Sequence, residues 1–437
     1  MRESFDYITR SLDRLPNAGE HVLIGFRGES SDFVRFNGTK IRQIGHVRQA
    51  SARVTLIRDQ RQASAGFDLS GDPEQDRARL GFLTDRLRDE LKLLPADPFL
   101  HYATGPVDTE RVDAVNLPDV RDAVTGITRA FDRADMTGIW ASGDICAGFA
   151  NSLGQKNWHS IGNFNFDFSV HAGDDSVKRS LSGQAFDPDA LAAESDVALQ
   201  SLAMFAQPAR RLRPGTYRAY LAPAAVAEII RLLSWNGFGL QNLESRSSPL
   251  VRMVTGDQRL DSRVSLIEDN RRGFAPQFTD HGFIKPPEIA LIENGGHAGC
   301  LVGARSAREF GVAVNAGEES PRSLRMAPGA LPDRDVLRAL DTGIYVSNLW
   351  YCNFSERNDC RITGMTRFAC GWVENGALCG PIEPMRFDDS LYRLLGDRLV
   401  DLTDQTTLFL DADTYACRSM ASVRVPGVLV GGISLKL

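Results

Sequence analysis

The chain has 437 residues, of which 43% are hydrophobic and 24% are charged. These values are ordinary for a globular protein and exclude a disordered, collagen-like or coiled-coil chain. Because a domain usually holds about 100–200 residues, the length predicts two or three domains. The net charge of −6 leaves no basic surplus to neutralise a phosphate backbone, so we expect no nucleic-acid partner.

The first residues and the cysteines bear on the cellular compartment. The opening MRESFD lacks the apolar core of a signal peptide. No stretch approaches the ~20 apolar residues that a membrane span needs. The seven cysteines are odd in number and include no CxxC pair, which favours reduced thiols over a disulfide framework. We therefore expect a cytoplasmic protein that does not contact a membrane.

The first part of the chain has the pattern of an α+β unit. The pair Asn37-Gly38 is typical of a tight hairpin turn and predicts a hairpin over 33–44. Aspartate followed by proline, at Asp72 and at Asp187, predicts two helix starts, since aspartate caps free N–H groups and proline suits the first turn. The expected strands are 20–26, 32–37, two within 41–57, 139–149 and 158–172, and the expected helices are 72–91, 120–134 and 187–206.

A polar segment with two prolines, residues 208–215, predicts the domain boundary. We place an N-terminal α+β domain at 1–212 and a β-rich C-terminal domain at 213–437. The second begins with an expected strand at 217–221 and a helix at 223–235, followed by short strands. Two of its segments share the order apolar-Glu-Asn-Gly, which predicts hairpin turns at Asn294-Gly295 and Asn375-Gly376.

The sequence contains few motifs of known catalytic sites. It has no phosphate-binding loop, dinucleotide fingerprint, nucleophile elbow or His-Glu-x-x-His helix. His297 and Cys300 are spaced so that both could reach one zinc ion, although two ligands do not make a site. The alternative is a turn histidine beside a buried thiol. Asp411, Asp413 and Cys417 could also cluster, although an exposed acidic turn is the commoner arrangement.

Several segments, in order and spacing, resemble the TldD/PmbA family and within it the PmbA (TldE) branch. They are 34–41, 150–154, 213–217, 221–223, 294–299, 341–346, 362–364, 371–376, 380–383 and 423–430. The resemblance implies a two-domain α+β protein with an intertwined β-rich C-terminal half. It also implies a peptidase system of two related chains that cleave unfolded or extended peptides, including precursors of modified peptides and antitoxins. The TldD-like chain carries zinc on a His-Glu-x-x-x-His helix with a distant cysteine, and the PmbA-like chain lacks that motif.

The resemblance also locates the zinc helix in this sequence. At the same offset from Leu221, Arg231 stands at the first ligand, Leu232 at the general base and Asn236 at the second ligand. Arginine has no lone pair to donate and leucine cannot take a proton from water. Cys417 falls near the zinc cysteine, where a buried inert thiol is the alternative. We expect no catalytic residue, metal or cofactor in this chain, and zinc in a TldD-like partner.

Four further cysteines lie in strand-like sequence. Burial as small hydrophobic side chains is the expected role of Cys352, Cys360, Cys370 and Cys379, to which we assign no function.

These observations leave four hypotheses, in order of preference. The first is a peptidase subunit that needs a TldD-like partner and an extended peptide substrate. The second is a stand-alone peptide-binding homodimer, to whose exposed sheet edge a peptide adds as a strand. The third is a modulator of another protein, such as DNA gyrase. The fourth is an independent hydrolase that uses residues such as His297 and Cys300.

Overall fold

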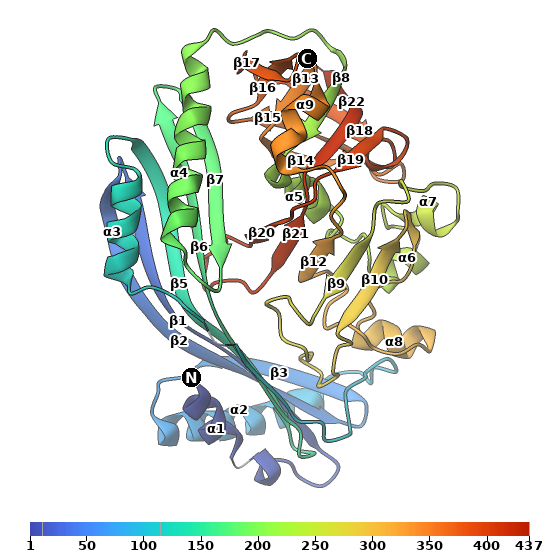
Figure 1. The fold of residues 1–437 in the computed structure, drawn as a ribbon. Coiled ribbons are helices and arrows are strands. Elements are labelled where there is room, and N and C mark those ends of the chain that lie inside the picture. The colour runs from blue at the N-terminus through green and yellow to red at the C-terminus, as the bar shows by residue number, and fades with distance from the viewer. Residues whose placement is uncertain (11, 114, 437) are drawn as a thin grey trace.

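The computed structural model describes residues 1–10, 12–113 and 115–436 (Figure 1). Their strands form a seven-stranded N-terminal sheet, a six-stranded middle sheet and a nine-stranded C-terminal sheet. The ladders between named strands are antiparallel except for β4–β6, β8–β13 and β12–β21. This arrangement confirms the predicted α+β class. The boundary at 212/213 stays a prediction, and Leu437, the predicted end of the second domain, lies outside the described residues.

The helices and strands have the following bounds. The α-helices are α1 (Arg2–Thr9), α2 (Pro73–Leu91), α3 (Val120–Ala130), α4 (Pro188–Ala203), α5 (Pro223–Leu232), α6 (Leu240–Glu244), α7 (Val251–Val254), α8 (Ala304–Phe310) and α9 (Val336–Leu340). Shorter helical turns lie at Leu12–Arg14, Met204–Ala206, Asp333–Asp335 and Arg393–Asp397. The N-terminal sheet has the order β3-β2-β1-β5-β6-β4, with β7 on β6, and consists of β1 (His21–Asn37), β2 (Lys40–Arg58), β3 (Arg61–Asp68), β4 (Thr109–Asp113), β5 (Asp135–Asn151), β6 (Lys156–Ala172) and β7 (Asp175–Gly183).

The other two sheets belong to the second half of the chain, from β8 onward. The middle sheet, in the order β11-β10-β9-β12-β21-β20, consists of β9 (Leu266–Asp269), β10 (Glu288–Glu293), β11 (Gly296–His297), β12 (Ser323–Met326), β20 (Thr407–Leu410) and β21 (Ser422–Val425). The C-terminal sheet, in the order β14-β15-β18-β22-β8-β13-β16-β17 with β19 on β22, consists of β8 (Gly215–Leu221), β13 (Gly343–Val346), β14 (Asn348–Glu356), β15 (Arg361–Arg367), β16 (Gly371–Glu374), β17 (Ala377–Pro381), β18 (Arg386–Ser390), β19 (Leu399–Leu402) and β22 (Val428–Lys436).

The strands of the N-terminal sheet are longer than predicted. Both the break between 20–26 and 32–37 and the division of 41–57 into two strands are wrong, because β1 and β2 run through as strands of 17 and 19 residues. The residues between the two predicted strands remain paired, with Glu29 opposite Gln49 of β2. Glu29 and Ser31 are buried, at 2% and 0% exposure. They stay in the strand because the second half of the chain covers them.

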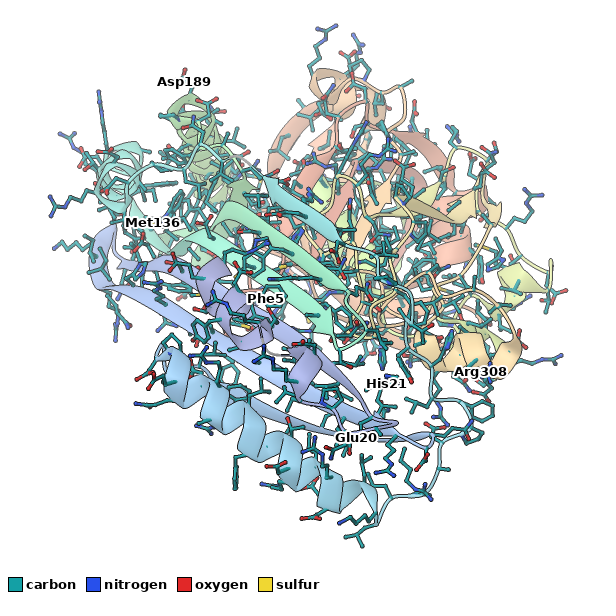
Figure 2. The ribbon with its side chains drawn as sticks, turned by 90° about the horizontal axis from the view of Figure 1, so that it is seen from below. Phe5, Glu20, His21, Met136, Asp189 and Arg308 are labelled. Atoms are coloured by element: carbon teal, nitrogen blue, oxygen red, sulfur yellow. The ribbon has the colours of Figure 1, made fainter. Side chains whose placement is uncertain are left out.

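Alternation along these strands gives the sheet two different faces. Phe26 packs with Phe5 and the core beneath α1 and α2, and Trp140 packs with the core beneath α3 and α4. Figure 2 labels Phe5 on α1, which lies against this face of the sheet. Odd-numbered residues on the opposite face, among them Phe149 and Ile161, pack against residues of the second half. Since neighbouring residues in a strand point to opposite sides, helices cover one face and the second half covers the other.

The predicted helix starts are confirmed. Asp72 Oδ1 accepts the N–H of Glu74 at 2.8 Å, and Asp187 Oδ1 accepts that of Asp189 at 2.9 Å. The predicted helix 120–134 instead ends at Ala130. The helix predicted to reach residue 206 ends as α4 at residue 203 and continues as a short turn.

The two predicted Asn-Gly turns are also confirmed. Asn294-Gly295 joins β10 to β11 and Asn375-Gly376 joins β16 to β17, with positive φ at all four residues. The first hairpin turns one residue later than predicted, because Asn37 pairs with Lys40 and the positive φ angles fall at Gly38 and Thr39.

Candidate functional site at the junction of the two halves

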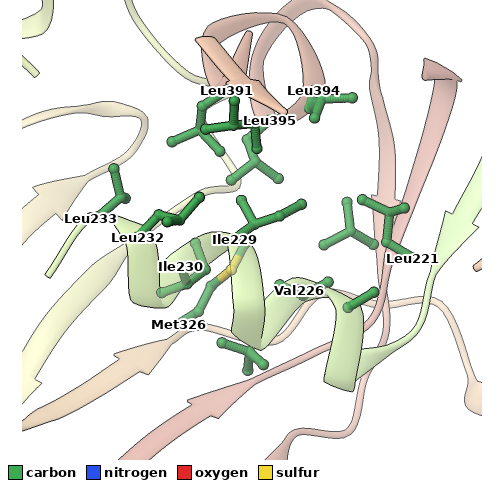
Figure 3. Packing of buried hydrophobic residues seen from close by; sticks show 14 of the residues in the cluster. Leu221, Val226, Ile229, Ile230, Leu232, Leu233, Met326, Leu391, Leu394 and Leu395 are labelled. Carbon is green, nitrogen blue, oxygen red and sulfur yellow. The ribbon is translucent and has the colours of Figure 1, made fainter. Parts of the chain in front are cut away.

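Helix α5 follows β8, at the place where the sequence predicts a degenerate zinc helix. It begins with Pro223 and ends at Leu232, three residues before the predicted end. Ala225, Ile229 and Leu232 are buried and belong to its packing face. Figure 3 shows Ile229 and Leu232 on the side of the helix that faces a group of leucines, namely Leu391, Leu394 and Leu395. The helix therefore has a clear structural role.

The three positions of the degenerate motif lie in different surroundings. Arg231 Nη1 lies 3.5 Å from Glu228 Oε1, and Nη2 donates to the carbonyl oxygen of Leu410 at 3.4 Å. Leu232 is 3% exposed within the core of the second half. Asn236 lies beyond the end of the helix, exposed and with a φ of 66°. A ligand pair on one helical face is therefore not formed here.

Arg231 contacts the last residue of β20, and the loop after this strand contains the predicted acidic cluster. Asp411 and Asp413 are exposed, and each accepts a backbone N–H two residues further on, at 3.1 and 2.8 Å. Cys417 is exposed, so the alternative of a buried thiol is wrong for this residue; partial burial is still the largest cause that raises its pKa. The alternative interpretation of an exposed acidic turn fits this geometry. Among the described residues, no three His, Cys, Asp or Glu side chains converge in a way that could hold a metal ion.

His297 and Cys300 lie elsewhere, at β11 and just after it. His297 is exposed and pairs with Ile292, whereas Cys300 is partly buried. Partial burial lowers the pKa of the His297 imidazole and raises the pKa of the Cys300 thiol. Two donors alone do not make up the four-ligand set of a structural zinc site.

The four further cysteines do not share one environment. Cys360 and Cys370 are buried in the core of the second half, and Cys352 packs against that core. Burial raises the pKa of Cys352 and of Cys360 to about 12. Cys379 is exposed on β17, so the expectation of burial is wrong for this residue.

Directly after Cys417, Arg418 ties the loop to the N-terminal sheet. Its backbone N–H donates to Glu29 Oε2 at 3.0 Å, and its guanidinium donates to Ser31 Oγ at 3.3 Å and to the Asn163 carbonyl oxygen at 3.1 Å. Arg418 is 6% exposed, and burial lowers its pKa to about 10. It therefore stays charged at neutral pH and anchors the loop from within.

A cavity of about 370 Å³ lies between β7 and β20. Each of these strands is at the edge of its sheet, since β7 pairs with β6 and β20 pairs with β21. The two strands lie next to each other in Figure 1. Ser182 of β7 donates to the carbonyl oxygen of Leu408 of β20 at 3.1 Å, which joins the two edges at one point. The lining residues are 180–184, Glu194, Arg272, Phe274, 406–408 and Arg424.

Comparison with protein families identifies the second half. Residues 214–436 match the model of the PmbA/TldA metallopeptidase C-terminal domain. The chain belongs to the TldD/PmbA family. No curated protein matches the sequence. Within the described residues, no helix is long and apolar enough to cross a membrane.

Solved structures of TldD/PmbA-like proteins share the fold over the whole chain. A candidate modulator of a DNA gyrase from Thermotoga maritima is 15% identical, with a TM-score of 0.77 and 100% of both chains covered. TldE from Thermococcus kodakarensis is 14% identical, with a TM-score of 0.78 over 99% of this chain and 100% of the other. A candidate modulator of DNA gyrase from Bacteroides thetaiotaomicron is 14% identical, with a TM-score of 0.73 over 100% and 97%.

In this TldD/PmbA family member, the sequence analysis missed the residues that join the two halves. Besides Arg418, these include His159, whose Nε2 lies 2.9 Å from the carbonyl oxygen of Phe274. Arg272 and Arg424 of the cavity were missed as well. The one sequence signal was the row of polar side chains at odd positions of the long strands, which marks a second buried face.

Proposed function

We propose that this chain is the non-catalytic, TldE-like subunit of a two-chain metallopeptidase system that acts on unfolded or extended peptides. The observation that carries this proposal is the state of the zinc-helix positions. Arg231 bonds to the carbonyl oxygen of Leu410, Leu232 lies in the core and Asn236 lies beyond the helix. Metal-assisted hydrolysis needs a Lewis acid to activate water and a base to take its proton, and these side chains supply neither.

In this proposal the two chains divide the work. The TldD-like partner brings zinc on its His-Glu-x-x-x-His helix, and the present chain brings the retained fold and a surface for the peptide. Membership of the TldD/PmbA family and the fold shared with a TldE protein support this division. Short peptide precursors are the expected substrate class, because the family resemblance implies substrates with an unfolded or extended backbone.

Reconstitution tests the proposal. Mixing the purified chain with a TldD-like protein should give a stable complex that cleaves unstructured peptides, and a chelator should abolish the cleavage. Arg231→Ala and Asn236→Ala should keep the rate within about twofold, because neither side chain reaches the reacting atoms. As the matched control, replacing a zinc ligand of the partner should abolish cleavage. Failure to form a complex, or loss of cleavage in a correctly folded Arg231→Ala variant, would contradict the proposal.

A second candidate is a stand-alone peptide-binding protein, which forms a homodimer in the absence of a TldD-like chain. The facing edge strands β7 and β20 favour it, because a free edge can take up a peptide as an added strand without catalysis. The names of two structural relatives suggest a third role, as a modulator of DNA gyrase. The net charge of −6 weighs against direct contact with DNA and leaves contact with a protein open.

A further inference from the structure

The cavity between β7 and β20 has the size and the accessibility of a binding site. Its volume of about 370 Å³ lies within the ~300–1,000 Å³ typical of small-molecule sites. Arg272 and Thr407, both in its lining, are exposed, so the cavity is open to solvent. The two strands that flank it are sheet edges, whose outward backbone N–H and C=O groups can bond to a ligand.

The charges in the lining do not balance. Glu194 is already paired with Arg179 outside the lining. Arg272 and Arg424 also line the cavity, and among the described residues neither guanidinium has an ion pair or a hydrogen bond. The cavity therefore presents two positive charges that are available to an anion.

An arginine on the neighbouring strand differs from Arg424 in its ion pairs. Arg325 of β12 stands next to Arg424 of β21 in the parallel ladder. Arg325 is neutralised by Asp269, at 2.8 Å, and by Glu288, at 3.6 Å. Because Asp269 already pairs with Arg325, it compensates Arg424 only in part. Of these two neighbouring arginines, the one in the cavity is the one left for a ligand.

We propose that this cavity binds the C-terminal carboxylate of a short extended peptide, held by Arg272 and Arg424. Two guanidinium groups suit a carboxylate because they form strong charge-assisted hydrogen bonds with it. The space exceeds that of a lone anion, and the free strand edges offer partners to a peptide backbone. The inference deepens the proposed function by naming the part of the substrate that this subunit binds, and it rests on that function for the choice of a peptide.

Binding to the lone chain tests this inference. The probe is an unstructured pentapeptide with a fluorophore at its N-terminus, prepared with a free C-terminal carboxylate and, separately, as the C-terminal amide. Fluorescence anisotropy should show that the acid binds at least ~10-fold more tightly than the amide, because only the acid forms charge-assisted hydrogen bonds with the two guanidinium groups. Arg424→Gln and Arg272→Gln should each remove most of this difference.

The matched control is Arg271→Gln. Arg271 is the exposed neighbour of Arg272 and does not line the cavity, so this variant should keep the preference for the acid. Arg272 is exposed as well, so its variant tests the site even if Arg424→Gln does not fold. Inorganic phosphate serves as the competitor and should displace the peptide only weakly.

Three results would overturn the inference: equal binding of acid and amide, displacement by phosphate at the peptide's own affinity, or unchanged binding in both cavity variants. None of these results bears on the proposed non-catalytic role, which is tested separately by the cleavage assay with the reconstituted complex. Conversely, a carboxylate preference in a chain that forms no complex with a TldD-like protein would support the site and contradict the proposed function.

Discussion

Acidification should weaken the contact between the N-terminal sheet and the second half, because a neutral histidine is buried there. His159 is 1% exposed, its Nε2 lies 2.9 Å from the carbonyl oxygen of Phe274, and its Nδ1 has no hydrogen-bond partner. Burial lowers its pKa from 6.5 to about 4. Between pH 6.5 and about 4, His159 therefore binds a proton in the unfolded chain but not in the folded chain. The free energy of unfolding decreases as the pH falls through this range.

The size of this loss follows from the two pKa values. Between 6.5 and about 4 the pKa difference is about 2.5, and each pKa unit corresponds to ~1.4 kcal/mol. The full loss in the free energy of unfolding is thus ~3 kcal/mol, of which about 2 kcal/mol falls between pH 7 and pH 5. Other groups also titrate in this range, so the informative quantity is the difference between the wild type and a variant.

Urea unfolding at pH 7 and pH 5 measures that difference. His159→Gln keeps an N–H donor for the Phe274 carbonyl and carries no titrating group, so it should lose about 2 kcal/mol less than the wild type between these pH values. His171→Gln is the matched control on the same strand, because its Nε2 bonds to Thr137 and leaves His159 in place. If the free energy of unfolding of His159→Gln fell between pH 7 and pH 5 by as much as that of the wild type, the reasoning would be refuted.

Two further predictions concern packing and thiol exposure. Gly148→Ala should lower the free energy of unfolding by about 1–3 kcal/mol, since the added Cβ would lie 2.7 Å from the Phe5 ring. Gly25→Ala is the control, because an added Cβ on this neighbouring strand would have open space around it, and it should be nearly neutral. Thermal unfolding of both variants measures the difference, and equal destabilisation would contradict the described packing of Gly148 against Phe5. Cys379 and Cys417 should be labelled first by a maleimide, as read by peptide mass spectrometry, because both are exposed. Faster labelling of the buried cysteines would contradict the described fold.

Local signals in the sequence predicted local structure well. The capping aspartates and the Asn-Gly turns depend on residues only a few positions apart. The caps at Asp72 and Asp187 and the turns at Asn294-Gly295 and Asn375-Gly376 were found where expected, and the turn at Asn37-Gly38 was one residue off. The continuous strand β1 could not be predicted in the same way. Its buried Glu29 accepts the backbone N–H of Arg418, which is 389 residues away in the sequence. Without that partner, a polar stretch resembles a turn, because polar groups are rarely buried unpaired.

The site was predictable only where it depends on one segment. The sequence placed Arg231 and Leu232 on the helix after β8, but it extended that helix to residue 235, three residues beyond its end at Leu232. Arg272 and Arg424 meet at one cavity only through the packing of separate segments. Neither arginine stands in a recognisable motif, so the sequence carried no sign of their common site.

The zinc content and peptidase activity of the lone chain test the central claim most directly. Elemental analysis of the purified protein, followed by incubation with an unstructured peptide, should show no stoichiometric zinc and no cleavage. The reason is that Arg231 and Leu232 stand where a ligand and a base are needed. A full equivalent of zinc together with turnover, both lost on replacing His297, Cys300 or Cys417, would contradict the account and make this chain an enzyme in its own right.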